Sequence, residues 1–133
     1  MRQVIVLAGA LALAGCQTAS TSDQIAEAAK HVPPNYRHLV ADHIRKTFKD
    51  PYTIRDASIS GPVPGTSFSG SIASICVRAN AKNSMGAYIG IKATQFVFRN
   101  GVLDIATEIQ TDYACAGASY EPFPEIEEKK PRA

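Results

Sequence analysis

The sequence predicts an α+β fold, in which one amphipathic helix packs on an antiparallel sheet of about four strands that one disulfide stabilises. Three observations support this prediction. Apolar residues recur at three- and four-residue spacing over 36–48, and beyond residue 52 the hydrophobic period changes to two. Asn100-Gly101 is a dipeptide that favours the tight turn of a β-hairpin. At 133 residues, 45% hydrophobic and 20% charged, the chain has the size of a single domain with flexible ends.

Two helices are expected before the sheet. Thr21 or Ser22 can cap a short helix over residues 23–32, which ends at two consecutive prolines. Asn35 is a favourable cap for a longer helix, and Asp50-Pro51 ends it because the residue before proline avoids the helical region. One face of this longer helix carries the apolar residues Tyr36, Leu39, Val40, Ile44 and Phe48. We expect this face to cover the sheet, since no other long amphipathic element is available.

Four strands are expected after these helices. They are expected over residues 53–60, 72–82 and 87–99 and directly after Asn100-Gly101, with a turn-rich loop over 61–65 and a turn over 83–86. A two-residue turn at Asn100-Gly101 pairs Phe98 with Leu103 and Phe96 with Ile105. This register would place four large apolar side chains on one face of the sheet.

The first fifteen residues have the pattern of a secretory signal peptide. Met1-Arg2-Gln3 is a positive start, and an uncharged run of apolar or small residues follows that is too short to span a bilayer, which takes about 20 residues. The run ends in Leu13-Ala14-Gly15-Cys16, which resembles the lipobox of bacterial lipoproteins. The resemblance implies that Cys16 is acylated and anchors the chain to a membrane. An ordinary cleaved secretory peptide and a buried apolar helix are the alternatives.

The chain is expected to divide into four parts. These are a signal peptide over residues 1–15, a lipidated tether over 16–22, a small α+β domain over 23–120 and a tail over 121–133. The tail is rich in Pro, Glu and Lys, which predicts disorder. Gln17 stands where an Asp is the usual retention signal for the inner membrane of enteric bacteria. By resemblance to that sorting rule, we expect a periplasm-facing protein on the outer membrane of a Gram-negative bacterium.

Cys76 and Cys115 are the two cysteines that remain once Cys16 is acylated. An even pair in an oxidising compartment predicts a disulfide. Because Cys76 and Val77 lie on opposite faces of a strand, this disulfide requires the segment after the fourth strand to cross back over the face of Cys76. A metal-binding pair or a catalytic thiol are the alternatives, although no further Cys or His stands at ligand spacing.

Residues 76–90 carry a second resemblance. A cysteine stands four residues before Asn-Ala-Lys-Asn, and Gly-x-Tyr-x-Gly follows. In this motif the chain is similar to a group of small uncharacterised bacterial envelope proteins, over about residues 42–98. The resemblance implies a secreted domain and no particular activity. The motif has two interpretations: residues that shape a turn, or a surface for a ligand or partner formed by Asn80, Lys82, Asn83 and Tyr88.

Charge and motif content argue against several classes of function. The formal net charge is +2 and no basic run exceeds two residues, so nucleic-acid binding is not expected. His31, His38 and His43 do not share a helix face, so no metal site is expected. The chain has no serine elbow, no phosphate-binding glycine loop and no paired carboxylates in an apolar setting. Neither catalysis nor a cofactor is therefore expected.

Two functions stay open for the folded domain. In the first, it has a structural or protein-interaction role and binds another envelope protein through a sheet edge or the second helix. In the second, it is a small binding or inhibitor module for a soluble periplasmic enzyme or ligand. The lipoprotein inhibitors of lysozyme, which are likewise short, disulfide-bonded and lipid-anchored, are examples of the second class.

Overall fold

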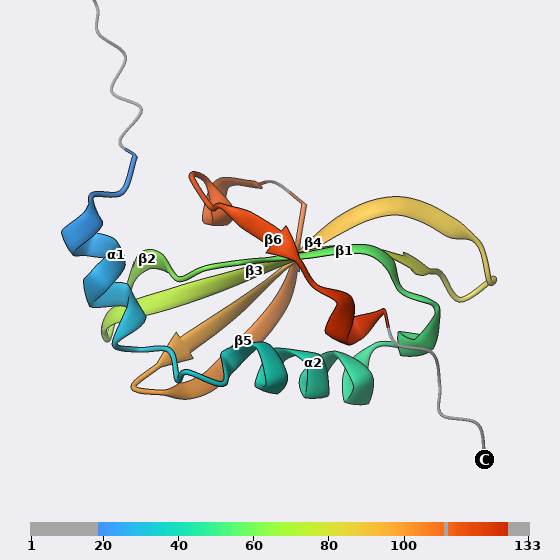
Figure 1. Ribbon diagram of the computed structural model, residues 1–133, viewed down its shortest axis with the longest axis horizontal. Coiled ribbons are helices and arrows are strands. Elements are labelled where there is room, and N and C mark those ends of the chain that lie inside the picture. Colours follow the sequence, from blue (N-terminus) through green and yellow to red (C-terminus); the bar gives the residue numbers. More distant parts are fainter. Residues whose placement is uncertain (1–18, 111, 128–133) are drawn as a thin grey trace, which may run out of the picture.

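A computed structural model describes residues 19–110 and 112–127 (Figure 1). The expected signal peptide, Cys16 and the last six residues lie outside this range. The described elements, in chain order, are α1 (Ser22–Ala29), α2 (Tyr36–Thr47), η1 (Pro51–Thr53), β1 (Arg55–Ser60), β2 (Val63–Ser67), β3 (Gly70–Lys82), β4 (Tyr88–Arg99), β5 (Val102–Ile109), η2 (Asp112–Cys115), β6 (Tyr120–Pro122) and η3 (Pro124–Ile126). This content confirms the predicted α+β class.

One antiparallel sheet contains all six described strands, in the order β5-β4-β3-β1-β6, while β2 pairs with β3 beyond the end of β1. About four strands were expected. The loop predicted over 61–65 is wrong in its second half, because β2 begins at Val63, which is buried. Pro64 is tolerated there, since β2 has a strand on one side only among the described residues and a proline needs no partner for a missing N–H on the open side.

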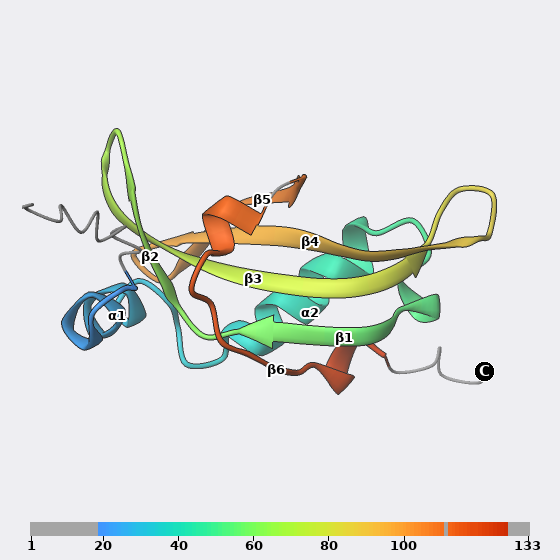
Figure 2. The same ribbon diagram turned by 90° about the horizontal axis from the view of Figure 1, so that it is seen from above.

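The helix α2 lies across one face of the sheet (Figures 1 and 2). Its residues Val40, Ala41 and Ile44 are buried in one cluster with Ile75 of β3 and Phe96 of β4. The α2 residues share one face because of their helical spacing, and the strand residues share one face of the sheet because side chains alternate along a strand. The two apolar faces therefore pack against each other. Each fully buried large side chain contributes about 1.5–3 kcal/mol, so this contact contributes substantially to the stability of the domain.

The hairpin of β4 and β5 forms around the predicted turn. Asn100 and Gly101 have φ values of 49° and 80°, and Phe98 pairs with Leu103 as expected. The predicted pairing of Phe96 with Ile105 is wrong. The register shifts between Phe98 and the residue before it, so Phe96 faces Ala106 and Ile105 is 55% exposed. A β-bulge that takes up one extra residue of β5 reverses the side on which the next side chains point.

The segment predicted as a disordered tail is ordered from residue 121 to 127, which corrects that prediction. The strand β6 pairs with β1, and Phe123 and Ile126 are 0% and 1% exposed. Both side chains join the cluster beneath α2. Around these two apolar residues, Glu121, Pro122, Pro124 and Glu127 are exposed, so the polar composition that suggested disorder is compatible with an ordered segment.

The short helix α1 packs on β2 at the end of the sheet. Thr21 caps it through a capping box with Gln24, as the sequence allowed, and the helix ends at Ala29. Asn35 stands at the expected cap position of α2 but makes no side-chain capping bond. After α1, the chain runs beside the β4–β5 turn, where the Gly101 N–H donates to the His31 carbonyl at 2.8 Å.

Candidate functional site

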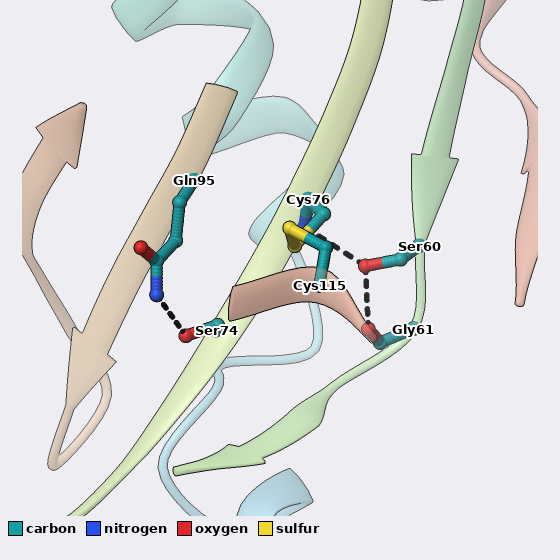
Figure 3. Close-up of a disulfide and its surroundings, with 6 residues drawn as sticks. All are labelled: Ser60, Gly61, Ser74, Cys76, Gln95 and Cys115. Atoms are coloured by element: carbon teal, nitrogen blue, oxygen red, sulfur yellow. Dashed lines mark hydrogen bonds between the residues drawn. A yellow bond between two sulfur atoms is a disulfide. The ribbon is translucent and has the colours of Figure 1, made fainter. Parts of the chain in front are cut away.

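Cys76 and Cys115 form the predicted disulfide, on the face of the sheet opposite α2 (Figure 3). The two cysteines are 39 residues apart, and η2 brings Cys115 back over β3. They are 0% and 3% exposed. A bonded and buried pair offers no thiolate to a substrate, so the alternative of a catalytic thiol does not hold. The disulfide is a structural cross-link.

Hydroxyl groups beside the disulfide satisfy the buried backbone (Figure 3). The Cys76 N–H donates to Ser60 Oγ at 2.8 Å, and the Ser60 hydroxyl donates to the Gly61 carbonyl at 2.8 Å. On the neighbouring strands, Gln95 Nε2 donates to Ser74 Oγ at 2.7 Å. These bonds pair groups that would otherwise be costly to bury. They explain polar residues on this face without invoking a ligand.

The fold brings three of the four residues proposed as an interaction surface together at the β3–β4 hairpin, namely Lys82, Asn83 and Tyr88, and buries the fourth. Asn80 is only 9% exposed, and its side-chain oxygen has no hydrogen-bond partner. Asn83 shapes the β3–β4 turn, because its Oδ1 accepts from the N–H groups of Met85 and Ala87 at 2.9 and 3.0 Å. This is the turn-forming role that its sequence position also allowed. Lys82 and Tyr88 pair across the hairpin and are half-buried.

Two cations lie near the ring of Tyr88. The Arg55 guanidinium lies 3.7 Å from the centre of its ring and Lys82 Nζ lies 5.5 Å from it. The Tyr88 hydroxyl donates to the Thr53 carbonyl at 2.7 Å. These contacts fix the base of the β3–β4 hairpin to η1. They make Tyr88 a positioning residue for the surface beyond it.

A cleft of about 310 Å³ opens between the end of α2 and the sheet. Because α2 ends at Thr47, it leaves the far part of β3 and β4 uncovered. Apolar side chains form much of its wall, namely Phe48, Val77, Ala79, Ala81 and Ile89. Its charged lining consists of Lys49, Asp50, Lys82, Lys92 and Glu108. The cleft thus combines an apolar floor with three lysines against two carboxylates, of which Lys92 and Glu108 pair at 2.8 Å.

The outer edge of β4 is open beside this cleft. Pairing with β5 ends where Ala93 faces Ile109, so residues 88–92 pair with β3 on one side and have no strand on their outer side in the described part of the chain. Ile89 and Ile91, in this segment, are 51% and 60% exposed. We call residues 88–92 and the cleft of 310 Å³ the distal surface. The sequence analysis named Lys82, Asn83 and Tyr88, which lie in this surface, but the sequence does not reveal where the partner strand of β4 stops, so the position of the open edge was not predicted.

The three histidines do not come together. His38 Nε2 lies 3.5 Å from Asp42 on the exposed side of α2, and His43 packs edge-on against Phe96 at 5.7 Å between ring centres. His31 Nδ1 accepts from the Asn100 N–H at 3.4 Å. In residues 19–110 and 112–127, no group of three or more His, Cys, Asp or Glu side chains could hold a metal ion.

The chain matches no protein-family model, no curated protein and no solved structure. The lipobox-like motif and the likeness to small envelope proteins therefore stay predictions from the sequence. Within the described residues, no helix has the length and apolar character needed to cross a membrane. The distal surface is the candidate functional site that geometry supports best, because it combines exposed apolar side chains, an open strand edge and a cleft.

Proposed function

We propose that this is a lipid-anchored protein that faces the periplasm from the outer membrane of a Gram-negative bacterium and binds another envelope protein, without catalysis. Leu13-Ala14-Gly15-Cys16 supports the anchor, since a lipobox places the acylated cysteine directly after the cleaved signal peptide. The disulfide supports an oxidising compartment, because such bonds persist in the periplasm and are rare in the cytosol.

The open edge of β4 is the observation that carries the binding role. Residues 88–92 present backbone N–H and C=O groups with exposed Ile89 and Ile91 beside them. Edges of this kind bind an extended segment of a partner as an added strand, with pockets that receive alternate side chains. Two features make this edge a poor partner for an arbitrary strand. The register is irregular around Gly90, where φ is 99°, and Lys92 is exposed. We therefore expect one specific partner rather than self-association.

The charges around the cleft indicate what the partner segment carries. Lys49 and Lys82 line the cleft with Asp50, while Lys92 already pairs with Glu108. The excess of lysine favours a segment with a carboxylate near an apolar side chain. The apolar side chain would enter the cleft, and the carboxylate would meet the lysines at its rim.

The anchor is tested by metabolic labelling with palmitate. The wild-type chain is expected to take up the label and to fractionate with the outer membrane, whereas Cys16→Ser loses both properties. A Cys16→Ser variant that still fractionates with the membrane would overturn the anchor.

The binding role is tested by photo-crosslinking in intact cells. A photoreactive amino acid at position 89 is expected to give one discrete adduct, and the same group at Ile105, which is similarly exposed on β5, gives none. Lys49→Glu is expected to weaken the adduct several-fold, whereas Lys46→Glu, on α2 and outside the cleft lining, leaves it unchanged. Equal adducts at positions 89 and 105 would overturn the site.

The identity of the adduct separates the two functions that the sequence left open. An integral outer-membrane partner supports the proposed interaction role. A soluble periplasmic enzyme that the purified domain inhibits would replace it with the inhibitor role.

A further inference from the structure

Exposed apolar side chains gather at both ends of the molecule. Met85 and Ile89 lie at the end that carries the β3–β4 turn, where the distal surface also lies. At the opposite end lie α1, the β2–β3 turn and the β4–β5 turn (Figures 1 and 2). Here Ile25, Phe68 and Val102 are 43%, 111% and 64% exposed. We call this the anchor end, defined by α1 and residues 67–70 and 99–102.

Phe68 is the most exposed large apolar side chain of the described chain, and its turn is ordered by hydrogen bonds. Arg99 donates to Ser69 Oγ at 2.7 Å and to Ser67 Oγ at 3.0 Å, and the Ser67 hydroxyl donates to the Gly70 carbonyl at 3.1 Å. The turn therefore holds the ring out in solvent instead of folding it back. Leaving a phenylalanine in water forgoes the free energy of burying its ring, which an apolar environment outside the domain would recover.

The chain that leads to the expected acyl group enters at the same end. Ser20 lines a cleft of about 400 Å³ together with Thr66 and Ser71, which flank the β2–β3 turn. From Cys16 to the helix cap at Thr21 are five residues, which span at most about 18 Å when fully extended. If Cys16 carries the acyl chains, this short connection keeps the anchor end within that distance of the bilayer. The inference below therefore rests on the proposed anchor at Cys16.

We propose that Phe68 inserts into the interfacial region of the membrane that holds the acyl chains of Cys16, and that Val102, in the β4–β5 turn of the same end, enters this region as well. Aromatic and aliphatic side chains partition into this region, and a covalent anchor keeps the turn near it at no further cost in translational freedom. The domain then stands with its anchor end on lipid and its distal surface directed away from the membrane, toward a partner.

The absence of tryptophan from the sequence gives a direct test, because Phe68→Trp becomes the sole indole of the protein. The full lipidated chain is reconstituted in vesicles of phosphatidylethanolamine and phosphatidylglycerol, some of which carry brominated acyl chains. We expect F68W emission to shift to shorter wavelength and to be quenched by bromine several-fold more strongly than in the control Met85→Trp. Met85, at the other end, is 90% exposed. Val102→Trp is a second reporter and is expected to follow F68W.

Flotation of the same vesicles separates this inference from the anchor. If the wild-type chain floats with the vesicles and F68W and V102W are quenched no more than M85W, the inserted turn is overturned and the anchor stands. If the wild-type chain fails to float, the anchor and the inserted turn are both overturned. Flotation together with selective quenching of F68W supports both. Pure lipid vesicles contain no protein pocket, so selective quenching in them also excludes a protein partner as the required occupant.

Discussion

Arg37 on α2 donates two hydrogen bonds to Glu125 on η3, from Nε to Oε1 at 2.7 Å and from Nη2 to Oε2 at 2.9 Å. The same guanidinium donates to the Pro122 carbonyl at 3.0 Å and lies 5.2 Å from the centre of the Phe123 ring. Arg45, two turns further along α2, donates to the backbone carbonyl of Glu125. One face of α2 therefore fixes the C-terminal segment to the domain.

Glu125→Gln is expected to reduce stability and to change its pH dependence. The hydrogen bonds from Arg37 lower the pKa of Glu125, so the folded state favours the ionised carboxylate. The contribution is present above the ordinary carboxyl pKa and is lost as the pH falls through the lowered pKa of the folded state. We expect a loss of no more than about 1 kcal/mol at neutral pH, because solvent screens both partly exposed side chains.

Urea unfolding at neutral pH, and again well below the ordinary carboxyl pKa, measures this difference. The free energies of unfolding of wild type and Glu125→Gln are expected to converge in acid. Glu121→Gln is the matched control, because Glu121 is 79% exposed and lies 3.7 Å from the same guanidinium. A constant difference between wild type and Glu125→Gln across the pH range would show that the charge of Glu125 is not what stabilises the segment.

Removal of the disulfide is expected to destabilise the domain strongly. Cys76→Ala or Cys115→Ala opens a loop of about 40 residues, which corresponds to roughly 2–5 kcal/mol in small domains. Denaturation of the oxidised wild type, the reduced wild type and each variant gives the free energies. Mass spectrometry of the unreduced protein after thiol alkylation gives the pairing. Two alkylated thiols in the domain would contradict the cross-link.

Local sequence patterns were sufficient to predict the parts of the fold that depend on residues close to one another in the chain. The spacing of Val40 and Ile44 predicted α2, and Asn100-Gly101 predicted the last hairpin. The predicted pairing beyond that turn was wrong because it assumed that side chains alternate strictly along β5. Asp104 forms a bulge there, and the local sequence pattern does not reveal it. The bulge places Ala106 rather than Ile105 opposite Phe96.

Contacts between distant parts of the chain decided the features that sequence reasoning missed. Order in the C-terminal segment depends on contacts with distant residues, among them the burial of Phe123 in the core and the bonds between Glu125 and Arg37, which lies 88 residues earlier. The distal surface depends on where β5 stops relative to β4, a relation between two strands that neither strand encodes alone. Of the proposed interaction residues, Asn83 could be placed in a turn from its type and position, whereas the burial of Asn80 depends on the neighbouring strands.

Phe123→Ala tests whether the C-terminal segment belongs to the core. The ring is fully buried among residues of the main cluster, so its removal leaves a cavity and is expected to cost about 3–5 kcal/mol. Phe68→Ala is the control, since that ring is fully exposed and its loss is expected to leave the free energy of unfolding nearly unchanged. If the two variants have equal free energies of unfolding in urea, residues 121–127 do not belong to the core.

Replacement of both Asn100 and Gly101 by Val tests the turn that sets the β4–β5 register. A Cβ added at Gly101 would meet no atom within 4 Å, so the cost at this position comes from the backbone conformation. The φ values of 49° and 80° are strained for a β-branched residue. Accommodation would require the turn to open, which displaces Phe98 and Leu103 from their pairing. We expect a loss above about 2 kcal/mol and a lower thermal midpoint.

Ser84→Val, in the exposed β3–β4 turn and not at positive φ, is the control and should change the midpoint little. If the double variant has the same thermal midpoint as Ser84→Val, strand packing alone must set the register, and the Asn-Gly turn only accommodates it.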